Sequence, residues 1–108
     1  MANTFKLKSK ANVGVTTAGV YVVPSSTSTV VIGITLANTS GSSVNVGCGI
    51  TRGSADNINL LKNVPLPQGS SLEVMQGNKV VLETTDTFTA ISDVNNSIDV
   101  ALTIMEIT

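Results

Sequence analysis

The sequence contains no histidine and only one cysteine, Cys48. Without histidine, a Ser-His-Asp triad and an imidazole base are excluded, and the commonest metal ligand is missing. A lone cysteine excludes an intrachain disulfide and a zinc site built from the usual ligands. A pair of carboxylates, as in glycosidases, is a catalytic arrangement that this composition leaves open. We therefore expect a protein that is not an enzyme and that uses no metal and no cofactor.

Charged and aromatic residues are also scarce. Only 12% of the residues are charged, and six basic against seven acidic side chains give a net charge of −1. This balance offers no electrostatic grip on nucleic acid or on an anionic membrane, so neither is expected as a partner. The aromatic residues are Phe5, Tyr21 and Phe88, with no tryptophan. So few rings make a poor stacking platform for bases or sugars.

Hydrophobic residues make up 42% of the chain and recur with a period of two, which is typical of strands. Turn residues separate these segments at a spacing of about ten residues. The pattern predicts an all-β, single-domain β-sandwich or jelly roll of about eight short antiparallel strands over residues 1–108. Strands are expected at residues 5–10, 20–23, 29–37, 43–52, 58–62, 72–75, 80–82, 88–91 and 98–104.

The segment 29–37 is apolar on both faces, which predicts a central strand covered on both sides. Turn residues at 38–42 lead into the segment 43–52, and the two strands are predicted to form a β-hairpin. In the second strand Gly47 and Gly49 fall on the outward phase, which indicates a bulge or the close approach of another backbone. The opposite, apolar phase holds Val44, Val46, Cys48 and Ile50.

Farther along the chain, residues 64–69 contain two prolines and are interpreted as an extended connection, and a turn is expected at 76–78. In the last predicted strand, alternate residues share one apolar face; they are Ile98, Val100, Leu102 and Ile104.

The first ten residues are interpreted as either an N-terminal arm or an edge strand. Phe5 and Leu7 alternate with three lysines, which gives a strand with one apolar face and one basic face. The basic face is either solvated or laid against an acidic partner or a neighbouring subunit. The candidate residues for a contact between subunits are Phe5, Lys6, Lys8 and Lys10.

The stretch 11–51 contains no charged residue, although it includes the most hydrophobic strands. Soluble β proteins usually protect strand edges with charge, above all with lysine. Two interpretations follow. Either these surfaces are covered by other subunits in the working state, or the stretch supplies inner strands that Ser, Thr and Asn solvate. The first interpretation predicts a homo-oligomer or a larger assembly.

Several segments together resemble small virion structural proteins of tailed bacteriophages, of the marine and cyanobacterial type. The resemblance rests on strand-and-turn patterns at residues 20–24, 31–42, 61–74, 77–83 and 104–108. It implies a capsid decoration or cement subunit whose partners are copies of itself and other virion proteins, above all the major capsid protein. The implied location is the virion, on the capsid surface, after synthesis in the host cytoplasm. The resemblance supplies no functional residues.

Two alternatives remain open. The first is a tail, neck, baseplate or fibre-attachment component of the same particle. The second is a carbohydrate- or receptor-binding β module, which the shortage of aromatic side chains disfavours.

Overall fold

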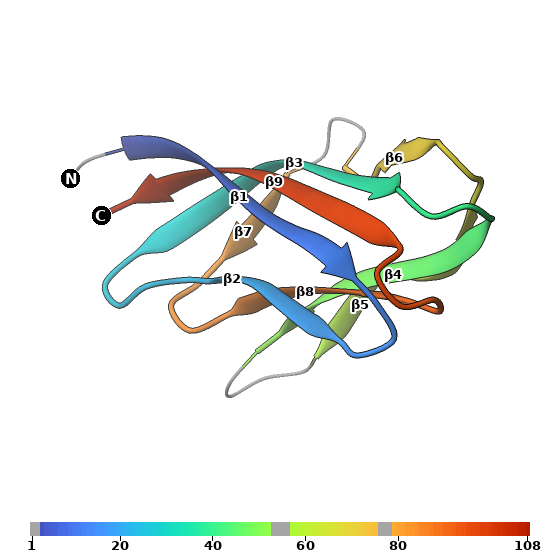
Figure 1. Ribbon diagram of the computed structural model, residues 1–108. Coiled ribbons are helices and arrows are strands. Elements are labelled where there is room, and N and C mark those ends of the chain that lie inside the picture. Colours follow the sequence, from blue (N-terminus) through green and yellow to red (C-terminus); the bar gives the residue numbers. More distant parts are fainter. Residues whose placement is uncertain (1–2, 53–56, 76–78) are drawn as a thin grey trace.

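The computed structural model describes residues 3–52, 57–75 and 79–108, and these residues form nine strands and no helix (Figure 1). All strand pairs are antiparallel, and the strands form two facing sheets. The all-β sandwich is therefore confirmed. The strands are β1 (Asn3–Val13), β2 (Ala18–Val22), β3 (Ser28–Asn38), β4 (Val44–Thr51), β5 (Ile58–Leu66), β6 (Ser71–Glu73), β7 (Val80–Leu82), β8 (Thr87–Ser92) and β9 (Ile98–Ile107).

The strand order is that of a jelly roll. Sheet I has the order β1-β9-β3-β6, and β7 also pairs with β3; sheet II has the order β2-β8-β4-β5. Because β6 and β7 both run antiparallel to β3, at its two halves, they act as two pieces of one interrupted edge strand. Counted in this way, each sheet has four strand positions, and every connection crosses between the sheets except the one from β4 to β5, as in a double Greek key.

The core lies between the inner faces of the two sheets. The two predicted apolar faces are confirmed, since Ile98, Val100, Leu102 and Ile104 line it from sheet I. Sheet II contributes the matching set, which is Val44, Val46, Cys48, Ile50 and the fully buried Phe88. Branched aliphatic side chains fill most of this space, and they suit a pleated, covered surface.

The predicted hairpin between residues 29–37 and 43–52 is wrong. Their strands, β3 and β4, belong to different sheets, and the connection between them crosses from sheet I to sheet II. A five-residue connection can span either the ~5 Å between paired strands or the ~10 Å between packed sheets, so its length does not distinguish the two. The Asn38 side chain fixes the crossing by donating to the carbonyl oxygens of Ser42 and Leu66, both at 2.9 Å.

Two further predictions need correction. β5 continues through Pro65 to Leu66, whereas the sequence indicated a connection from residue 64. It is an edge strand, and an edge tolerates proline because a missing N–H costs no ladder bond there. Secondly, β3 is not covered on both sides, since Val30 is half-buried and Ile32 is 37% exposed. The turn expected at 76–78 lies outside the described residues.

Candidate functional site

β1 forms one edge of sheet I, and its three lysines point toward the inside of the sandwich. Lys6, Lys8 and Lys10 lie directly opposite Ile104, Leu102 and Val100 of β9. Directly opposed residues share a face of the sheet, and those three β9 residues are core residues. The basic face of β1 is therefore the inner face, and its apolar face is turned outward. Inward-pointing charge on an edge strand blocks pairing with another strand.

The first of these lysines, Lys6, forms an ion pair with the buried carboxylate of Glu106. Lys6 Nζ lies 2.8 Å from Glu106 Oε1, and the phenol of Tyr21 donates to Glu106 Oε2 at 2.5 Å. Thr29 Oγ1 is 2.9 Å from the same phenol oxygen, and the Lys8 ammonium lies 5.8 Å from the centre of the Tyr21 ring. Because Tyr21 belongs to β2, this cluster joins the two sheets at one end of the sandwich.

The cluster shifts the protonation of both acids in it. The Lys6 ammonium, followed by the hydrogen bond from Tyr21, holds the pKa of Glu106 below its ordinary value. Burial, followed by the hydrogen bond to Glu106, raises the pKa of Tyr21 to about 12. At neutral pH the cluster therefore contains a carboxylate, an ammonium and a neutral phenol, and each compensates the burial of the others.

The outer face of sheet I carries a row of apolar side chains that crosses the sheet. Phe5, Met105, Val30 and Val81 lie directly opposite one another on β1, β9, β3 and β7. The two ends of the row are the most exposed, with Phe5 at 69% and Val81 at 62%. Leu7 lies beside Phe5 on the same face and is 67% exposed. We name these five residues the apolar face.

No charge interrupts the apolar face within the strand segments that carry it. The charged residues of segments 3–9, 28–33, 80–82 and 103–107 are Lys6, Lys8 and Glu106, and all three lie on the inner side. Contiguous exposed apolar patches of this kind mark interaction surfaces in soluble proteins. Of the four predicted contact residues, Phe5 alone belongs to this face. Lys6 and Lys8 serve the Glu106 cluster, and Lys10 is exposed on the inner phase of β1.

The sequence did not indicate Val30, Val81 or Met105 as contact residues. They come from three strands far apart in the chain, and only the registers β3–β9 and β3–β7 bring them into one row. The alternation within β1 was the available signal, because it placed Phe5 and Leu7 together on one face of the strand.

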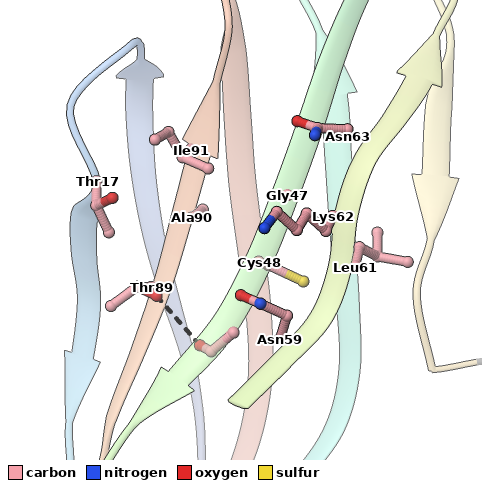
Figure 2. Close-up of a pocket in the computed structure, with 11 residues that line it drawn as sticks. Thr17, Gly47, Cys48, Asn59, Leu61, Lys62, Asn63, Thr89, Ala90 and Ile91 are labelled. Carbon is pink, nitrogen blue, oxygen red and sulfur yellow. Dashed lines mark hydrogen bonds between the residues drawn. The ribbon is translucent and has the colours of Figure 1, made fainter. Parts of the chain in front are cut away.

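The outer face of sheet II is shaped differently and contains a groove of about 260 Å³. Figure 2 shows Thr89 and Ile91 of β8 on one side of β4, and Asn59, Lys62 and Asn63 of β5 on the other. Thr17 lines the same groove from the connection between β1 and β2. Thr89 Oγ1 donates to the carbonyl oxygen of Gly49 at 3.3 Å, so one wall is bonded to the floor. We name this feature the glycine groove.

The floor of the groove is the backbone of β4 at the two outward glycines, and both predicted features, bulge and close approach, are confirmed there. The register of β4 against β5 shifts on both sides of Cys48. A Cβ at Gly49 would lie 2.3 Å from the Ile58 carbonyl oxygen, and one at Gly47 would lie 3.1 Å from that of Leu61. β4 therefore needs glycine at positions 47 and 49, because β5 could not otherwise approach it so closely.

Beneath the groove, Cys48 points into the core. Burial raises the pKa of its thiol to about 11, so the thiol stays protonated near neutral pH.

The remaining charged cluster ties two loops together. Arg52 Nε lies 3.2 Å from Asp86 Oδ1, and the same guanidinium binds Glu83. The other oxygen of Asp86 accepts the backbone N–H of Glu83 at 2.9 Å. This pair of carboxylates thus shares one cation and closes a turn before β8. Within the described ranges, no three cysteine or acidic side chains converge as they would around a metal ion. The described part of the chain also has no helix of the length and apolarity that membrane spanning requires.

Comparison with known proteins supports the fold. No protein-family model matches the chain, and no curated protein matches it. Among solved structures, the chain is similar to one described as "Bacillus endospore appendages form a novel family of disulfide-linked pili". The likeness covers 99% of this chain and 87% of that one, with a TM-score of 0.59 and 14% identity. At this identity the likeness is one of fold.

Proposed function

We infer that this chain is a non-catalytic structural subunit that works by packing against other subunits of a larger assembly. The observation that carries this proposal is the apolar face of sheet I. Phe5 and Leu7 are more than two-thirds exposed, while the lysines of the same strand are turned inward. This orientation leaves apolar area in water, and contact with another subunit would remove that area from water.

The orientation of β1 also favours contact through the face of the sheet over contact through its edge. Two copies of β1 paired edge to edge would place lysines opposite lysines on the inner side, which is unfavourable. The five residues of the apolar face carry no charge, so a contact through them places no lysine opposite a lysine. The proposed packing is therefore sheet against sheet, in the manner of the sandwich interior itself.

The size of the face indicates a weak single contact. One row of outward residues across four strands, extended by Leu7, covers roughly 160 Å² of flat sheet, from the standard strand and residue spacings. Two such surfaces together lie well below the ~1,200 Å² at which specific, stable interfaces begin, so a single contact would be weak. Such a contact becomes firm when many copies are held in a regular array, because each further contact forms at a high effective concentration.

For the assembly itself, we propose the virion of a tailed bacteriophage, with the chain as a decoration or cement subunit on the capsid surface. The support is the resemblance to small phage virion proteins given above, together with the jelly-roll order of the strands. The alternative placement is a tail, neck, baseplate or fibre-attachment component of the virion. The likeness in fold to a protein described as forming pili supports self-association.

Electron microscopy of particles of the source phage, labelled with gold-conjugated antibody against this chain, tests the placement. Label over the whole head is the expected result and supports decoration. Label confined to the tail or neck supports the alternative. Absence of the protein from purified particles contradicts the virion proposal.

A further inference from the structure

We propose that two copies of this chain exchange their first strands, so that residues 3–10 of each copy pair with β9 of the other. The inference rests on the proposed function, since it names a second copy as the partner and describes how two subunits are joined. We name residues 3–10 the arm. The arm lies at the edge of sheet I, and β9 is its neighbour in that sheet.

The arm contributes no residue to the hydrophobic core. Lys8 is half-buried, and the other residues of the arm are exposed. The buried residue of β1 is Val13, which is 2% exposed and lies beyond the arm. The sandwich therefore keeps its core residues when the arm leaves. What the arm does cover is the edge of β9, and an uncovered edge is a template for another strand.

The edge of β9 is suited to this particular strand. Glu106 on β9 is 6% exposed, and Lys6 of the arm lies 2.8 Å from its carboxylate. A strand without an inward cation would leave that carboxylate unpaired, which is costly. The arm of a second copy brings the same lysine to the same place, in the same register. The charge on β9 therefore argues for a second copy as the partner.

The hinge for such an exchange lies at Asn12. The register of β1 against β9 shifts between Lys10 and Val13, and Asn12 has a left-handed backbone with φ at 58°. This conformation is unfavourable for a residue with a side chain, although asparagine tolerates it better than most. An extended hinge between two copies relieves this strain, and strained hinges favour exchange. After the hinge the chain is fixed to its own sandwich, because the Val13 carbonyl accepts the N–H of Ser97 at 3.0 Å.

One hydrogen bond opposes the opening of the hinge. The backbone N–H of Asn12 donates to Asp99 Oδ1 at 3.0 Å. Both groups are exposed, so water replaces this bond at small cost when the arm leaves.

Exchange also supplies the contact area that the apolar face lacks. That face covers only roughly 160 Å² on each copy, too little for a stable dimer. Exchange adds two full strand ladders between the copies and requires no new kind of contact, and the reciprocal form closes into a two-fold dimer. Each apolar face then combines residues of both copies. Phe5 and Leu7 come from one copy, and Met105, Val30 and Val81 come from the other.

Cysteines at facing positions of the arm and β9 test the proposal. In the double variant Ser9→Cys, Ala101→Cys the two thiols lie on directly opposed residues, at a spacing that suits a disulfide. The control is Thr35→Cys, Ala101→Cys, which joins β3 to β9 at directly opposed residues of one copy in either state. The three sites lie on the outer face of sheet I, so the fold should persist, and thermal unfolding verifies this. Both variants are incubated at about 1 mM, oxidised and separated on a denaturing gel without reductant.

We expect the arm variant to give dimers linked between chains, in a share that rises with protein concentration, and the control to give single chains. Single chains from both variants, at a concentration where the wild type associates, overturn the exchange and leave the proposed function standing. Equal linkage in both variants also overturns the exchange, because it reports contact between outer faces. A wild type that stays monomeric overturns both proposals.

Two substitutions at the hinge give a second measurement. Asn12→Gly removes the cost of the left-handed conformation and so favours the closed monomer, with a dissociation constant raised about tenfold because each dimer has two hinges. Asn12→Val adds a β-branched side chain that disfavours this conformation, and should lower the dissociation constant by a similar factor. Asn12 is exposed, so neither change should unfold the protein. Equal dissociation constants of the two variants in sedimentation velocity overturn the hinge and, with it, the exchange.

Discussion

The outer faces of the two sheets differ in the side chains that they expose. Sheet I presents Phe5, Leu7 and Val81 to solvent and turns its lysines inward, whereas sheet II covers two glycines with the backbone of a neighbouring strand. Apolar side chains protrude from the outer face of sheet I, whereas the outer face of sheet II contains the glycine groove. The difference shows that the surface of a sheet depends on outward glycines and inward lysines as well as on outward apolar side chains.

The largest expected effect on stability comes from a substitution at Gly49, on the outer face of sheet II. In a Gly49→Ala variant the new Cβ would lie 2.3 Å from the Ile58 carbonyl oxygen, so β5 must move away from β4. We expect the free energy of unfolding to fall by about 3 kcal/mol, measured from urea titrations. Gly41→Ala is the control, since nothing lies within 4 Å of its new Cβ. Equal midpoints for the two variants would contradict the close approach of β5.

The next effect concerns the inward lysines. Lys6→Met removes the cation from Glu106 and leaves that carboxylate, which is 6% exposed, without its ion pair. We expect a loss of about 1–2 kcal/mol in the free energy of unfolding, reduced from the value for a fully buried pair because the Lys6 side chain is 42% exposed. Lys10→Met, with the same change in charge on the same strand, should cost under about 0.5 kcal/mol. Equal losses for both would show that Glu106 does not depend on Lys6.

The same cluster predicts a dependence of stability on pH. The pKa of Glu106 is lowered in the folded protein, so the unfolded chain binds more protons as the pH falls. The stabilisation is complete above the ordinary glutamate pKa, near 4.5, and is lost as the pH falls through the folded value. We expect Glu106→Gln to flatten this acid limb in thermal unfolding measured from pH 6 to pH 3, a range set about the ordinary glutamate pKa.

Tyr21 should make stability depend on pH on the alkaline side. Its pKa is raised to about 12, so its contribution is present below pH 10, the ordinary value, and declines above it. Tyr21→Phe should remove the alkaline part of the dependence and retain the acid part. A wild type whose stability is level from pH 10 to pH 12 would contradict the raised pKa.

The smallest expected effect on stability comes from a substitution in the apolar face of sheet I. Val81 is 62% exposed, so Val81→Ser should change the free energy of unfolding by less than about 0.5 kcal/mol. It should still weaken self-association by a few fold, because the apolar face loses one end of its row. Sedimentation velocity beside a Val22→Ser control, a change at a 58% exposed residue outside the apolar face, measures the difference. Equal association of the two variants would remove Val81 from the contact surface.

Much of the fold could be predicted from the sequence, because period-two alternation shows directly in strands with one covered face. The core face of β9 and that of β4 were both visible in this way. The sheet to which a strand belongs was not visible. The connection at 38–42 has the composition of a hairpin turn, and only the pairing of β3 with β9 shows that it crosses between sheets.

The candidate surfaces were predictable in part, and for the same reason. Alternation in β1 separated Phe5 from the lysines, but it could not show which side faced the core. The usual rule would bury the apolar side. Here Glu106, distant in sequence, draws Lys6 inward and so determines the orientation. Likewise, the outward glycines indicated a close approach, whereas the groove depends on Thr17, β5 and β8, which the sequence does not place together.

The most direct test of the central claim, that the apolar face of sheet I is an assembly surface, is sedimentation velocity of the wild-type chain up to about 1 mM, the range of weak contacts. The series is run at low salt and again at about 1 M salt, where surface charge is screened. We expect the average mass to rise with concentration at both salt levels, because the contact is apolar. A monodisperse monomer throughout, or association that disappears at high salt, would contradict the account.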